Sequence, residues 1–162
     1  MTPDSDKVSH KVRMPALHPP FSGAPLSCVV LLLVVEAMIL VPRVRSMALL
    51  VRPFMVVSCV AAVIGAFLSG YQASSAVGTL SPEVEAVLAT HHLLGRFLLI
   101  TVGLLGTFFF LHRVAKRGHR VLLVMYYIAL VAQVLLTLRI GALGGALVFD
   151  HGVGVATTAT RR

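Results

Sequence analysis

Charged residues are scarce in this sequence. Only 12% of the 162 residues are charged, whereas 57% are hydrophobic, and a water-soluble domain is nearer a quarter charged and half apolar. The mean hydropathy of +0.92 therefore argues against a soluble fold. Because a bilayer core about 30 Å thick takes roughly 20 apolar residues per helical crossing, the chain has room for about four spans and one membrane domain.

Cysteine pairs and the usual catalytic motifs are also missing. Cys28 and Cys59 lie in different apolar runs, and neither belongs to a CxxC or CxxCH motif, which excludes covalent c-type haem and a zinc ribbon. The sequence has no nucleophile elbow, P-loop, HExxH motif or paired-carboxylate signature, so hydrolytic and phosphoryl-transfer enzymes have no support. We therefore expect a carrier or accessory protein more than a stand-alone enzyme. The net charge of +8 comes from Lys and Arg beside apolar runs, a pattern typical of membrane topology and not of nucleic-acid binding.

The hydrophobic runs predict an all-α, integral membrane four-helix bundle. The chain divides into a flexible basic N-terminal tail (1–21), the four-span bundle (22–145) and a C-terminal segment (146–162). We expect no cleavable signal, because the first 20 residues are polar and three further apolar runs follow the first. Proline at helix starts and the Ser81-Pro82-Glu83 capping sequence predict spans at about 24–41, 53–71, 82–111 and 121–140. Gly141 to Gly145 are expected to end or loosen the last helix.

Basic residues predict the orientation of the spans. The first and third connections hold seven of them: Arg43, Arg45, Arg52, Arg113, Lys116, Arg117 and Arg120. The opposite side holds five basic residues, all in the N- and C-terminal tails, and the loop between the second and third spans holds no basic residue. Because Lys and Arg accumulate in cytoplasmic loops, both termini are predicted to lie outside.

Histidines are predicted to gather at one interface. A four-span topology brings to the outer side four of the seven, namely His18, His91, His92 and His151. Arg96 lies one turn beyond His92 on the same helix face, and Arg139 lies near the end of the fourth span. Imidazoles from neighbouring segments are the usual ligands of b-type haem in helical bundles, with arginines beside the propionates. The alternative is that these side chains only snorkel or bind lipid headgroups, and spacing alone favours that alternative.

Glu36 lies within the first predicted span, and an ionisable residue there is a functional candidate by default. It is expected either to reach Arg43, Arg117 or Arg120 or to be neutral and hydrogen-bond across helices, and a proton relay is a further alternative. Tyr126, Gln133 and Thr137 form a weak polar stripe on the fourth helix. Such a stripe is more typical of interhelical hydrogen bonds than of a pathway.

Near the C-terminus stands the run GGALVFDHGVGV, residues 144–155. It resembles the C-terminal signature of an uncharacterised bacterial membrane-protein family, domain-of-unknown-function family 2231. The His18-Pro19-Pro20 sequence is similar to the His-Pro start of that family, and Gly23 stands where the family usually has a second histidine. Leu68-Ser69-Gly70 and His91-His92-Leu93 also resemble the family pattern.

The resemblance implies a four-helix domain of the bacterial inner (plasma) membrane with a haem or redox role, since family members are sometimes joined to cytochrome c modules. It implies that His18, His92 and His151 are the candidate metal ligands, with His91 as an alternative to His92. We therefore expect a b-haem electron-transfer protein, or such a subunit of a respiratory or photosynthetic assembly, with the lipid bilayer and other membrane subunits or a cytochrome as partners. The alternatives are a cofactor-free structural subunit and a small transporter, and the transporter is disfavoured because no internal repeat is obvious.

Overall fold

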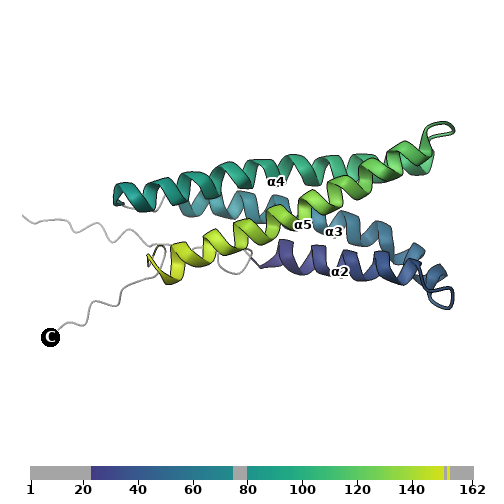
Figure 1. The fold of residues 1–162 in the computed structure, drawn as a ribbon, viewed down its shortest axis with the longest axis horizontal. Coiled ribbons are helices and arrows are strands. Elements are labelled where there is room, and N and C mark those ends of the chain that lie inside the picture. The colour runs from purple at the N-terminus through teal and green to yellow at the C-terminus, as the bar shows by residue number, and fades with distance from the viewer. Residues whose placement is uncertain (1–22, 75–79, 152, 154–162) are drawn as a thin grey trace, which may run out of the picture.

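The structure is a computed structural model, which describes residues 23–74, 80–151 and 153. They form four α-helices: α2 (Ala24–Ile39), α3 (Arg45–Ser74), α4 (Pro82–Val114) and α5 (His119–Phe149). Successive helices run in opposite directions (Figure 1), and the described residues contain no β-strand. The predicted all-α helical bundle is therefore confirmed.

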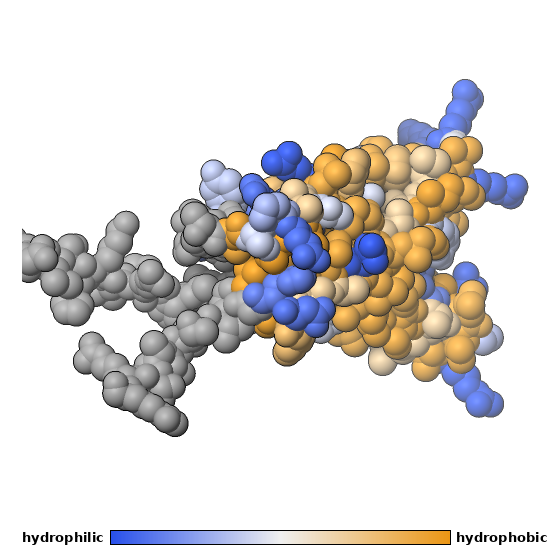
Figure 2. All heavy atoms as spheres, turned by 60° about the vertical axis from the view of Figure 1, so that its left-hand side comes forward, coloured by the Kyte–Doolittle hydropathy of each residue, from blue (hydrophilic) through white to orange (hydrophobic). Residues whose placement is uncertain are grey.

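The surface of the bundle is that of a membrane protein. Three helices are long and apolar enough to cross a membrane, namely α4, α5 and the Arg45–Gln72 part of α3, and α2 is a shorter apolar helix. Large hydrophobic side chains such as Leu31, Phe54, Ile100 and Leu135 are exposed on all four helices. Figure 2 shows this apolar surface over the middle of the helices, with hydrophilic residues projecting from the end that holds the helix connections. Burial in lipid accounts for such a surface, since water would not stabilise it.

The bundle consists of two helical hairpins. α2 packs mainly on α3, and α4 packs mainly on α5, while α3–α4 and α2–α5 contacts join the two hairpins. All four helices contribute to a single core, whose fully buried side chains include Leu32, Val56, Leu105 and Tyr126. We call the end that holds residues 40–44 and 115–118 the connection end, and the opposite end, where α4 begins and α5 finishes, the cavity end.

Helix α4 begins where its capping sequence predicts. The Ser81 hydroxyl accepts a hydrogen bond from the Val84 N–H at 3.5 Å, and Glu83 and Glu85 lie in the first turn, where the helix dipole favours negative charge. Pro82 takes one of the first positions, where a missing N–H costs nothing. These are local effects, which is why the start could be predicted.

The predicted start of α3 at Pro53 is wrong. The helix begins at Arg45, and Pro53 lies inside it, although an interior proline removes one backbone hydrogen bond. The residues on either side hold the helix in place, because Ala48, Arg52 and Val56 are all buried against the rest of the bundle. Arg52, which was assigned to a basic connection, is therefore a core residue.

The expected end of the fourth helix at Gly141–Gly145 is also wrong. Helix α5 continues through these glycines to Phe149, although each glycine in a helix costs about 1 kcal/mol relative to alanine. Tertiary contacts offset that cost. Leu147, beyond the glycines, is 5% exposed, and a Cβ at Gly144 would lie 3.4 Å from the His91 ring.

Candidate functional site

The short α2 leaves the cavity end of the bundle incomplete. At 1.5 Å per residue, α2 is about 24 Å long and α4 is about 50 Å long. Figure 1 shows α2 beside the half of the bundle that holds the connections, whereas α3, α4 and α5 continue past its N-terminus. Of the four described helices, three therefore extend into the cavity end beyond the start of α2.

A cavity of about 620 Å³ lies in this position. Apolar residues and glycines form most of its wall. All four helices contribute: Pro25 and Leu26 from α2; Val63, Ala66, Phe67, Gly70 and Tyr71 from α3; Gly95 and Leu98 from α4; Ile140, Gly141, Gly144, Gly145, Val148 and Phe149 from α5, together with Gly23 just before α2. Besides Tyr71, the polar residues on its wall are His91, His92, Arg96 and Thr137. A mostly apolar cavity with a few convergent polar groups is typical of a ligand or cofactor site.

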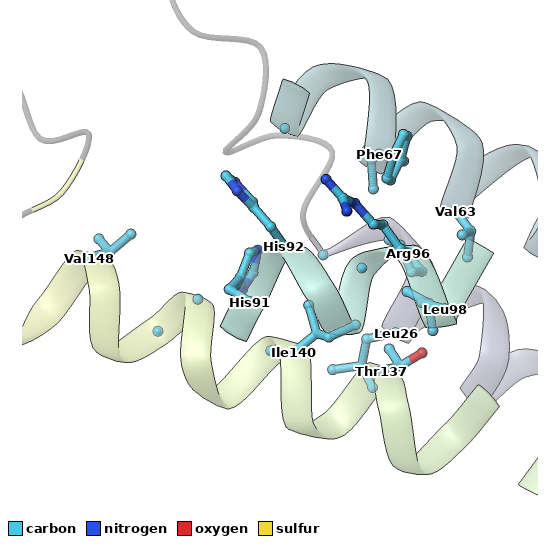
Figure 3. A pocket seen from close by; sticks show the side chains of 18 of the residues that line it. Leu26, Val63, Phe67, His91, His92, Arg96, Leu98, Thr137, Ile140 and Val148 are labelled. Carbon is cyan, nitrogen blue, oxygen red and sulfur yellow. The ribbon is translucent and has the colours of Figure 1, made fainter. Parts of the chain in front are cut away.

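His91 and His92 point in different directions from α4. Successive residues of a helix are about 100° apart, and the two rings are 6.2 Å apart with an interplanar angle of 61°. The His91 ring lies against α5, where its Cε1 would be 3.4 Å from a Cβ at Gly144. Figure 3 shows His92 and Arg96 projecting together on the other side of α4, away from α5. The structure thus brings an imidazole and a guanidinium to one face of the cavity.

Two glycines of the cavity wall have open space beside them among the described residues. A Cβ added at Gly95 on α4 or at Gly141 on α5 would meet nothing within 4 Å. Glycine is costly inside a helix, so its use at two positions that face open space favours a ligand lying against the helix backbones. Gly144 differs, because the His91 ring already occupies the space beside it.

Thr137 carries a buried hydroxyl that makes no hydrogen bond to the described residues. Four other hydroxyl side chains in the helices each donate a hydrogen bond to the backbone carbonyl three or four residues earlier. These are the hydroxyls of Ser27, Ser69, Thr90 and Thr101. Thr137 is 5% exposed, and its Oγ1 has no hydrogen-bond partner within the described part of the chain. A buried hydroxyl without a partner costs about 1–3 kcal/mol, and rotation about Cα–Cβ would let an oxygen in the cavity satisfy it.

Arg139 and His151 do not line the cavity. Arg139 is exposed on α5, and His151 is exposed just beyond its end, with its backbone N–H bonded to the Ala146 carbonyl at 3.2 Å. His18 lies outside the described residues. Over residues 23–74 and 80–151, no three His, Cys, Asp or Glu side chains are grouped as a metal site.

A second polar site surrounds Glu36, near the connection end. The Arg52 Nε donates to Glu36 Oε1 at 2.6 Å, the Tyr126 hydroxyl donates to the same oxygen at 2.5 Å, and the Tyr127 hydroxyl donates to Oε2 at 2.9 Å. The Glu36 and Arg52 side chains are each 8% exposed. The Arg52 guanidinium also lies 5.3 Å from the Phe109 ring centroid and 4.7 Å from that of Tyr126. We call these five residues the Glu36 cluster, and it joins all four helices.

Glu36 accepts hydrogen bonds from side chains of other helices. The predicted arginine partners Arg43, Arg117 and Arg120 are wrong, because the arginine that Glu36 meets is Arg52. Arg52 lies on the buried face of α3, at helical spacing from Ala48, Val56 and Cys59. That periodicity is the signal in the sequence that could have revealed it. Of the predicted polar stripe, Tyr126 bonds to Glu36 and Gln133 accepts from the Thr101 hydroxyl at 2.9 Å, as interhelical hydrogen bonds.

Known proteins provide no further guide to either site. No family model matches the sequence, and neither the comparison with curated proteins nor that with solved structures finds a match. The resemblance to domain-of-unknown-function family 2231 therefore stays a prediction.

Proposed function

We propose that this chain is a membrane electron-transfer protein that holds a b-type haem in the cavity. The observation that carries the proposal is the pairing of His92 with Arg96, one helical turn apart on the wall of a mostly apolar cavity. The volume of about 620 Å³ lies within the range of about 300–1,000 Å³ that is typical of such sites. The open faces of Gly95 and Gly141 suit a flat ring, and the unused Thr137 hydroxyl suits a ligand that carries oxygen.

Each polar residue of the cavity has a role in this proposal. His92 would hold the haem through an imidazole nitrogen, and Arg96 would offer a cation to a propionate. His91 packs against α5 and helps to keep α4 and α5 apart at Gly144. A second imidazole would come from His18 or His151, as the family resemblance implies, although His151 does not line the cavity. A bound haem would supply reversible one-electron transfer, and the apolar wall would limit the access of water to it.

In the cell, the protein would act as an electron carrier or as a haem-bearing subunit of a respiratory or photosynthetic assembly. We place it in the bacterial inner membrane, with other membrane subunits or a cytochrome as its electron-transfer partners. The absence of hydrolytic and phosphoryl-transfer motifs from the sequence supports a carrier or accessory role over that of a stand-alone enzyme.

An optical spectrum tests the haem proposal. Protein purified from a haem-replete host is expected to show a Soret band and a reducible α-band, because two imidazoles give a low-spin b-type centre. His92→Ala should lose both bands, whereas His119→Ala, at the connection end, should keep them. A colourless wild-type protein would contradict the proposal, and loss of the bands in His91→Ala but not in His92→Ala would move the ligand to His91.

The membrane orientation has its own test. Six exposed basic residues lie at the connection end once Arg52 is assigned to the core, and basic loops stay in the cytoplasm. At the C-terminus, a reporter that functions only outside the cytoplasm is expected to be active. After Arg117, a reporter that functions only in the cytoplasm is expected to be active. The opposite pattern of activity would reverse the orientation.

A cofactor-free structural subunit is the second candidate. The Glu36 cluster favours it, because the cluster ties the four helices together by contacts within the protein alone. The two candidates differ in one measurement, since only the first predicts a stoichiometric haem in the purified protein.

A further inference from the structure

The connection end carries a strong positive charge without any described acid to balance it. Six basic residues are exposed there, namely Arg43, Arg45, Arg113, Lys116, Arg117 and Arg120. Of the described acidic residues, Glu83, Glu85 and Asp150 lie at the cavity end. Glu36 lies nearer the connection end, but its charge is paired with that of Arg52. Like charges so close together repel one another, so this end favours an anionic partner.

Four of these cations surround one tight turn between α4 and α5. The turn occupies residues 115–118, and Gly118 adopts φ +73°, a left-handed conformation that glycine takes without strain. Arg113 precedes the turn, Lys116 and Arg117 lie within it, and Arg120 follows it. Helix α5 then begins without a side-chain cap and without an acid in its first turn. The positive end of the helix dipole therefore adds to the positive charge of the side chains.

Apolar side chains adjoin this charge on both helices. Leu111 and Val114 at the end of α4, and Val121 and Val124 at the start of α5, are all exposed. Val114 and Val121 directly flank the residues of the turn and its first helical residues, so the basic turn adjoins the exposed apolar surface of the bundle. A soluble anion would use only the charges, whereas a phospholipid would use both the charges and the apolar surface.

We propose that the basic α4–α5 turn, with the exposed apolar side chains beside it, binds an anionic phospholipid of the surrounding leaflet. The headgroup phosphate lies among Lys116, Arg117 and Arg120, and the acyl chains lie along Val114 and Val121. Each basic residue near an anionic membrane surface contributes about a fivefold gain in affinity. The site is separate from the cavity and does not depend on a bound haem.

Lipid titration of the purified full-length protein tests the proposal. Phosphatidylglycerol is expected to raise the thermal unfolding temperature more than phosphatidylcholine does, and salt should reduce the difference. The variant K116Q/R117Q/R120Q should bind phosphatidylglycerol on the order of 100-fold more weakly. The variant R43Q/R45Q, at the other connection, is the matched control and should keep most of the preference.

Three outcomes would overturn the proposal. One is equal stabilisation of the wild-type protein by the two lipids, and another is an unchanged lipid preference in K116Q/R117Q/R120Q. The third is a full stabilisation by inorganic phosphate alone, because the turn would then be a site for soluble anions. All of these measurements apply equally to a haem-containing and a colourless protein, so they are independent of the haem proposal.

Discussion

Replacing Glu36 by leucine is expected to lower the free energy of unfolding by about 3–5 kcal/mol, because Arg52 then remains as a buried charge without its partner. The same change removes the acceptor of the Tyr126 and Tyr127 hydroxyls. A loss of this size is a large part of the roughly 5–15 kcal/mol that holds a typical domain folded. Unfolding in detergent, followed by circular dichroism, measures it.

The double variant Glu36→Leu/Arg52→Met separates charge from packing. Replacing a buried ion pair by apolar side chains of similar size is often neutral or stabilising, and methionine can still lie against the Phe109 and Tyr126 rings. The double variant should therefore recover about half or more of the stability that Glu36→Leu loses. A double variant as unstable as Glu36→Leu would mean that the tyrosine hydroxyls, and not the Arg52 charge, cause the loss. A Glu36→Leu protein as stable as the wild type would contradict the buried ion pair itself.

Filling the cavity should abolish haem binding without unfolding the protein. In Gly141→Leu, the new side chain enters space that no protein atom occupies within 4 Å of its Cβ, and that space is the proposed place of the porphyrin ring. The apoprotein should be as stable as the wild type or more so, because leucine is favoured over glycine in a helix by about 0.8 kcal/mol. The Soret band should be absent while the helical circular dichroism is retained.

Gly103→Leu is the matched control for this variant. Gly103, like Gly141, is an exposed helical glycine with nothing within 4 Å of an added Cβ, but it does not belong to the cavity wall. Gly103→Leu should therefore keep the haem. If Gly141→Leu also keeps it with an unchanged spectrum, any haem in this protein binds outside the cavity.

Local features of the sequence determined the helical character of the protein and several helix boundaries. The apolar runs are long enough to predict membrane helices, because each needs only its own length and composition to be recognised. The start of α4 follows from Ser81, Pro82 and Glu83, whose capping interactions lie within four residues of one another. The pairing of His92 with Arg96 likewise follows from helical spacing.

Contacts between distant residues decided the rest. Glu36 is 16 residues from Arg52 in the sequence, and it is 90 residues from Tyr126 and 91 residues from Tyr127. Local reasoning could therefore identify a buried acid but not its partners. The same long-range packing extends α3 back to Arg45 past Pro53 and carries α5 through its glycines to Phe149. The cavity exists because α2 is shorter than the helices it packs against. Its walls come from four separate helices, and only their packing in three dimensions could bring His92, Gly95 and Gly141 around one space.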